Sequence, residues 1–81
     1  MILHLLKDPV DPLAIHTITA ESVTSAPTPV VVLLSPMRSI PQLPSVTLYR
    51  MTENPLYPHK GEIGYPRLVE LIFEADKVIA W

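Results

Sequence analysis

Few side chains in this sequence offer metal-binding or acid–base chemistry. The candidate metal ligands are His4, His16, His59, Asp8 and Asp11. No two of these His have the i, i+4 spacing that places both imidazoles on one face of a helix, as zinc sites on helices require. We therefore expect no metal ion. His4 is interpreted as a core or interface residue, and His59 as a loop residue.

Asp8 and Asp11 are the best candidates for binding a small molecule. Both follow an apolar run at residues 2–6 that predicts a buried strand, and open α/β sheets bind ligands at the carboxyl ends of their strands. Asp11 also precedes Pro12, and Asp before Pro is the usual signature of a turn or of a helix N-cap. The sequence leaves both roles open for these two carboxylates.

The chain has no Cys. This excludes a thiolate nucleophile, a persulfide carrier, a Cys-type zinc site and an iron–sulfur ligand set. Ser35 and Ser39 are the other candidate nucleophiles, but neither lies in a Gly-x-Ser-x-Gly motif. We therefore expect that the protein is not an enzyme and that it binds no cofactor.

Composition narrows the class of protein further. The chain has 81 residues, so residues 1–81 form one domain at most, and the net charge is -2. The six Lys and Arg residues are dispersed, which argues against nucleic acid as a partner. The longest apolar run, at 30–34, is far shorter than the roughly 20 residues that span a bilayer. The amino-terminal run also lacks the features of a secretory signal, and we expect a cytoplasmic protein without membrane contact.

The chain has 10 Pro, which mark the ends of the helices and strands that must position these side chains. Apolar or alternating runs predict strands at residues 2–6, 30–34, 46–51 and 77–81. Asp11-Pro12 predicts the start of a helix that ends near Ser22, and Tyr65-Pro66 predicts the start of a second helix. Residues 52–64 are expected to form a loop, and 37–40 at most one helical turn. The expected fold is α/β: a small, mostly parallel four-stranded sheet flanked by helices, a three-layer variant of the flavodoxin-like type.

Three aromatic residues are candidates for contacts or binding. Tyr49 and Trp81 stand in or at the end of expected strands, where large aromatic side chains supply anchor area for subunit contacts. Packing within the monomer explains both equally well. At Tyr65, the backbone N–H groups of a helix start are suited to an anion, although Pro66 removes one donor.

The order of these motifs resembles a known family. Ile2-Leu3-His4, the buried run at 30–34, and above all Tyr65-x-x-Leu68-Val69-Glu70-Leu71 followed by Asp76-x-Val78-x-Ala80-Trp81 are similar to the DsrE/DsrF-like superfamily. The nearest type within it is DsrH, also called TusB. The similarity covers nearly the whole chain, and its specific part is the last seventeen residues.

The resemblance implies a subunit of a cytoplasmic sulfur-relay assembly. DsrH-type subunits combine with DsrE-type and DsrF-type partners into a hetero-hexamer that passes persulfide sulfur toward tRNA wobble-uridine thiolation or dissimilatory sulfur oxidation. Relay chemistry in that family uses a Cys on the partner, and some DsrH-type members carry another Cys on their first helix. That position falls at His16 or a neighbour here, and His cannot carry persulfide sulfur.

The chain departs from the family pattern in a second place. The family usually has an acidic or amide residue followed by Gly after the second strand, whereas this chain continues as Ser35-Pro36-Met37-Arg38. With Pro41 and Pro44 beyond it, the helix of that region must be shortened or replaced. Because this region contributes to subunit packing in the family, the assembly is expected to differ.

Two functions from different classes follow from these observations. The first is a non-catalytic structural subunit of a sulfur-relay assembly, forming a homo-oligomer or a hetero-oligomer with Cys-bearing DsrE/DsrF-type paralogs. The alternative is a stand-alone small-ligand-binding or regulatory oligomeric module. Residues for a ligand or interface in either case are Asp8, Asp11, His16, Tyr49, Tyr65 and Trp81.

Overall fold

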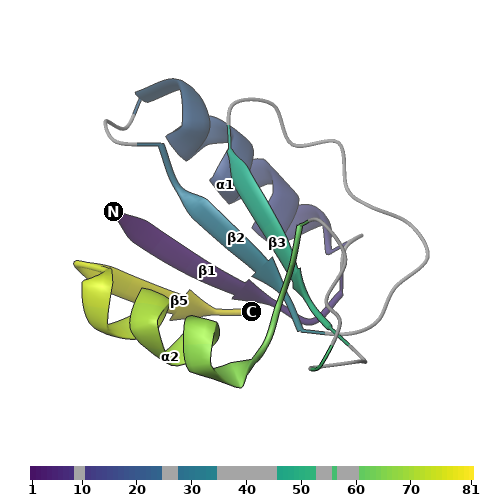
Figure 1. The fold of residues 1–81 in the computed structure, drawn as a ribbon. Helices are drawn as coiled ribbons and strands as arrows, with labels where there is room; N and C mark the ends of the chain where they lie inside the picture. Colours follow the sequence, from purple (N-terminus) through teal and green to yellow (C-terminus); the bar gives the residue numbers. More distant parts are fainter. Residues whose placement is uncertain (9–10, 25–27, 35–45, 53–55, 57–60) are drawn as a thin grey trace.

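One parallel sheet organises the described part of the chain. The computed structural model describes residues 1–8, 11–24, 28–34, 46–52, 56 and 61–81. The strands within them are β1 (Ile2–Leu6), β2 (Val30–Leu33), β3 (Thr47–Met51), β4 (Glu62–Ile63) and β5 (Lys77–Ala80), and the helices are α1 (Pro12–Thr24) and α2 (Tyr65–Glu74). The strand order is β4-β3-β2-β1-β5 with every neighbouring pair parallel (Figure 1). The expected α/β fold is confirmed, with five strands described where four were predicted.

The two central strands, β1 and β2, are apolar on both faces because both faces are covered. Leu3 and Val32 point to one face of the sheet, and Leu6 and Val31 point to the other. All four side chains are fully buried. The apolar run of β2, and that of β1 apart from His4, therefore reflect strands that pack on both sides, as parallel sheets require.

Helix α1 covers one face of the sheet. Ala14 and Ile18 lie one helical turn apart and are fully buried against Leu6, Val31 and Leu33. The helix contains several β-branched residues with modest helix propensity. Packing of this apolar face therefore supplies much of its stability.

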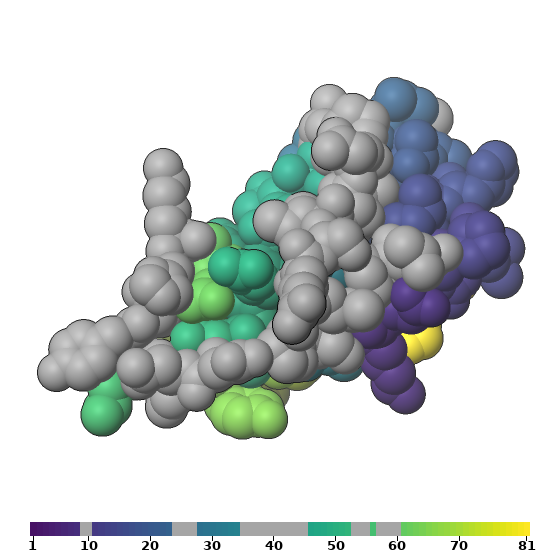
Figure 2. All heavy atoms as spheres, turned by 90° about the vertical axis from the view of Figure 1, so that its right-hand side faces the viewer, coloured from purple at the N-terminus to yellow at the C-terminus, as the bar shows by residue number. Residues whose placement is uncertain are grey.

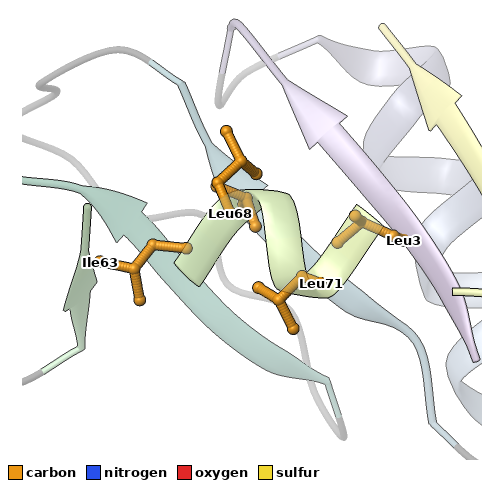
Figure 3. Close-up of a cluster of buried hydrophobic side chains, with 5 residues drawn as sticks. Leu3, Ile63, Leu68 and Leu71 are labelled. Carbon is orange, nitrogen blue, oxygen red and sulfur yellow. The ribbon is translucent and has the colours of Figure 1, made fainter. Parts of the chain in front are cut away.

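Helix α2 covers the opposite face. Leu68 and Leu71 point from the helix toward Leu3 and Ile63 of the sheet (Figure 3), and Val32 completes this buried cluster. Proline lies in the first turn of the helix, where its missing N–H is not needed. In Figure 1, α2 lies in front of the sheet and α1 behind it. The expected arrangement of helices flanking the sheet is thus observed.

Strand β4 was not predicted, because residues 52–64 were expected to be a loop. The strand has only two residues, Glu62–Ile63, too few to show an alternating pattern. Tertiary contacts hold it instead: Thr52 N donates to the Ile63 carbonyl at 2.9 Å, and Arg50 Nε pairs with Glu62 Oε2 at 3.3 Å. Gly61 precedes it with a φ of 84°, a conformation that Gly adopts without strain.

Two expectations lie outside the described residues: the helical turn at 37–40 and the loop position of His59. Within the described residues, neither helix has the length and apolar character needed to cross a membrane.

Candidate association surface

Asp8 and Asp11 lie where the sequence places them, after the carboxyl end of β1. Asp11 Oδ1 accepts hydrogen bonds from the backbone N–H groups of Leu13 and Ala14, at 3.1 and 3.3 Å. Asp11 N also donates to the Asp8 carbonyl at 3.2 Å, which forms the turn into α1. One carboxylate oxygen of Asp11 therefore caps α1 and is not directed to a ligand.

Figure 2 shows the molecule from the side toward which the strands run in Figure 1. The residues of α1 lie along one side of this view, and the yellow residues at the end of the chain lie beside purple amino-terminal residues. Within the described residues, no group of three His, Cys, Asp or Glu side chains is arranged to hold a metal ion.

The structure does not bring the remaining sequence candidates together. His16 lies exposed on α1, and Tyr65 lies 76% exposed at the start of α2. Tyr49 packs against the cluster under α2, whereas Trp81 packs against the cluster under α1. Tyr49 and Trp81 thus both contribute to packing within the monomer, on opposite faces of the sheet.

A series of hydrogen bonds joins Trp81, His4 and Glu21, and so connects the residue after β5 to β1 and α1. We call these three side chains the polar chain. His4 is fully buried, and its Nδ1 accepts a hydrogen bond from Trp81 Nε1 at 3.0 Å. Its Nε2 lies 2.5 Å from Glu21 Oε2. The two rings are nearly coplanar at 19° with centroids 6.1 Å apart, which fits an in-plane hydrogen bond better than a face-to-face stack.

These contacts select one tautomer of His4. The indole N–H is a donor only, so Nδ1 must present its lone pair. The imidazole proton therefore resides on Nε2 and is donated to the Glu21 carboxylate. Both ring nitrogens of His4 are thus engaged within the fold, and its role is structural. Sequence reasoning placed His4 in the core or an interface but did not identify Glu21, which is 17 residues away in the chain and follows no motif.

Helix α2 carries a stripe of apolar side chains that are exposed to solvent. Tyr65, Val69, Ile72 and Phe73 recur at i, i+4, i+7 and i+8, the spacing of one helical face, and are 76%, 47%, 38% and 84% exposed. Leu68 and Leu71, which contact the sheet, lie next to this stripe on the helix. The apolar sector of α2 is thus wider than the part of the helix that packs on the sheet. We call these four side chains the α2 stripe.

The charged residues of α2 show which way the stripe faces. Arg67 Nη1 pairs with Glu70 at 3.1 Å and with Glu74 at 3.5 Å on the flank opposite the stripe. Glu70, by hydrogen bonding, is the main cause that raises the pKa of Arg67 above its ordinary value, and a hydrogen bond to Tyr49 of β3 adds to it. This charged flank of α2 therefore faces β3. The opposite flank of the helix, where the α2 stripe begins, faces β5.

Strand β5 lies at the edge of the sheet, and its open side adjoins the stripe. Among the described strands, β5 pairs with β1 alone. Val78 is level with Leu3, so its side chain points to the α2 face, where it is 40% exposed. Val78 therefore points to the face of the sheet that carries α2, next to the side of β5 with which no described strand pairs. A hydrogen bond from the ammonium of Met1 holds the residue before β5, Asp76, and lowers the pKa of its carboxyl.

No protein-family model matches the chain, and no curated protein or solved structure was found to be similar to it.

Proposed function

We propose that this protein is a non-catalytic assembly subunit of the DsrH/TusB type, which holds a Cys-bearing chain in place within a sulfur relay. The observation that supports this proposal is the α2 stripe, an apolar helix face left open beside the edge strand β5. Contiguous apolar surface rimmed by polar residues is typical of a protein–protein contact. The relay itself would serve tRNA wobble-uridine thiolation or dissimilatory sulfur oxidation, the processes that the family resemblance implies.

The chemistry of the chain supports a structural role rather than a catalytic one. It has no Cys to carry sulfur. Its buried His4 has both ring nitrogens engaged within the fold, and an Asp11 carboxylate oxygen caps α1. His4 and Asp11, two of the polar groups considered for chemistry, are thus used to hold helices and strands together. Sulfur transfer would then depend on the thiol of the partner.

The scaffolding role depends on a rigid contact surface. The hydrogen bond between Trp81 and His4 fixes the residue that follows β5, and the bond from His4 to Glu21 ties that arrangement to α1. An edge strand held at both ends presents its backbone in one geometry. Preorganisation of this kind lowers the entropic cost of association.

Association with a Cys-bearing DsrE-type partner is the direct test. The purified chain is mixed with that partner, and the mass of the product is measured by light scattering. We expect a stable complex that contains both chains and that is weakened at least tenfold by Phe73→Asp. The matched control is Leu13→Asp, which introduces the same charge at a 65% exposed apolar position on α1 and should leave the complex unchanged.

Two results would contradict the proposal. One is a chain that never binds the partner at micromolar concentrations. The other is a thermal-shift screen of nucleotides and small anions in which one compound stabilises the isolated chain by several degrees while the partner has no effect. That second result would support the ligand-binding alternative.

A further inference from the structure

We propose that the α2 stripe and β5 are the interface for a second copy of this chain, joined by antiparallel pairing of the two β5 strands. This inference rests on the proposed function, because both require the α2 stripe to be a contact surface. Here the stripe of one copy faces the stripe of the other, and the Cys-bearing partner would bind the dimer that results. The two edge strands would make one continuous sheet across a twofold axis. The two α2 helices would then lie on the same face of that sheet.

The hydrogen bonds of β5 show which of its backbone groups are open to a partner. Trp81 N donates to the Leu5 carbonyl at 2.9 Å, and Ala80 is the residue level with Leu5. In a parallel ladder, one residue of each level pair bonds to the neighbouring strand through both its N–H and its C=O. The other residue of the pair has both groups turned away from that strand. The backbone groups of Ala80, and by alternation those of Val78, therefore point away from β1.

These open groups select one symmetric register. If Val78 of one copy pairs with Ala80 of the other, both bonded pairs form and Ile79 meets its own copy at the twofold axis. The side chains of Val78 and Ala80 lie on the α2 face in both copies, so the apolar surfaces join. A register shifted by one residue would place the α2 face of one copy against the α1 face of the other.

Charges are compatible with this pairing. Lys77 lies on the α1 face together with Ile79 and Trp81, and the register sets it opposite Trp81 of the second copy. An ammonium next to an indole is favourable, and the symmetry produces the contact twice. The two Lys77 side chains are separated by four residue positions, so they do not repel at close range.

The exposed area is sufficient for a dimer. A standard interface buries about 800 Å² on each partner, of which roughly 57% is apolar. Aromatic side chains present about 150–250 Å² each, so Tyr65 and Phe73, at 76% and 84% exposure, supply on the order of 300 Å². Val69, Ile72 and Val78 add the rest of the apolar part. The charges of α2 lie on its other flank and remain solvated.

Disulfide trapping tests the register. The natural chain has no Cys, so Ile79→Cys introduces a single thiol. Directly opposite residues in a non-bonded antiparallel pair have Cα atoms about 4.5 Å apart, within disulfide range. Ile79→Cys should form a covalent dimer quantitatively on mild oxidation. Lys77→Cys is the matched control on the same strand, because its two thiols would be roughly 13 Å apart. Equal cross-linking of both variants, or none at Ile79→Cys, would overturn the register.

Analytical ultracentrifugation of the chain alone tests whether a second copy of it occupies this surface. We expect a dimer, twice 9.0 kDa, whose dissociation constant rises at least tenfold in Ala80→Pro. Proline there removes an N–H that points away from β1, and the edge position tolerates it. Far-ultraviolet circular dichroism should confirm that the variant is folded. A chain that is monomeric alone but binds the Cys-bearing partner overturns this inference and leaves the proposed function intact. A chain that dimerises but ignores the partner contradicts the proposed function alone.

Discussion

The two faces of the sheet are closed to different degrees. On the α1 face, the helix buries Ala14 and Ile18 completely, and the polar chain through His4 ends in hydrogen bonds at both ring nitrogens. On the α2 face, the helix buries Leu68 and Leu71 but leaves the α2 stripe in solvent. One face is thus closed within the monomer, whereas the other leaves apolar side chains exposed, and these are the side chains that the proposed contact would cover.

The largest effect on stability is expected on the closed face. Leu6 is fully buried under α1, so Leu6→Ala removes packed methyl groups and leaves a cavity. The free energy of unfolding should fall by about 2–5 kcal/mol, measured by urea denaturation. Val69→Ala in the stripe, 47% exposed, is the contrasting variant, and at protein concentrations below dimerisation its change should stay within about 0.5 kcal/mol. Equal losses at the two positions would erase the contrast between the faces.

The polar chain should be the next most sensitive feature. Trp81→Phe removes the indole N–H and leaves His4 Nδ1 buried without a donor, which costs about 1–3 kcal/mol. The double variant with His4→Leu tests whether the two residues act together, because its loss should be smaller than the sum of the single losses. Strict additivity would mean that the hydrogen bond contributes nothing.

Loss of the α1 cap should have a moderate effect. Asp11→Ala leaves the N–H groups of Leu13 and Ala14 without their acceptor, and the expected loss is about 1 kcal/mol. Asp11→Asn retains an acceptor oxygen and should restore most of the stability, which distinguishes capping from a role of the charge. If Asp11→Asn is as unstable as Asp11→Ala, the cap is not the reason.

The smallest effect is expected at Asp76, on the open side of the molecule. The hydrogen bond from the Met1 ammonium lowers the pKa of Asp76 below its ordinary value of 3.8. A lowered pKa in the folded state stabilises the fold above that ordinary value, and the contribution is lost as the pH falls through the lowered pKa. Asp76→Asn should therefore lower the unfolding temperature slightly at pH 7, and this effect should shrink as the pH falls through the lowered pKa. A larger effect at pH 2 than at pH 7 would reverse the assignment.

The fold was largely predictable because its central elements carry strong local signals. The apolar run that forms β2, and the run that forms β1 apart from His4, predict strands buried on both faces. Asp11-Pro12 and Tyr65-Pro66 predict the starts of both helices. Strand β4 was missed because Glu62–Ile63 is held by tertiary contacts, not by a local pattern.

The site was less predictable. Tyr65 was named from its place at a helix start, but the width of the apolar sector of α2 matters only once the position of the sheet is known. Phe73 and Leu71 are both apolar residues of one helix, and yet one is 84% exposed and the other 3%. The partnership of His4 with Glu21 and Trp81 spans 17 and 77 residues, and no local spacing indicates it.

Amide hydrogen exchange in β5, followed by NMR at several protein concentrations, tests the central claim most directly. The backbone N–H groups of Val78 and Ala80 face away from β1, whereas the N–H of Trp81 donates to Leu5. The exchange of Val78 and Ala80 should slow as the concentration rises, while that of Trp81 is protected at every concentration. Exchange rates at Val78 and Ala80 that stay fast and independent of concentration would show that the open face has no second copy against it.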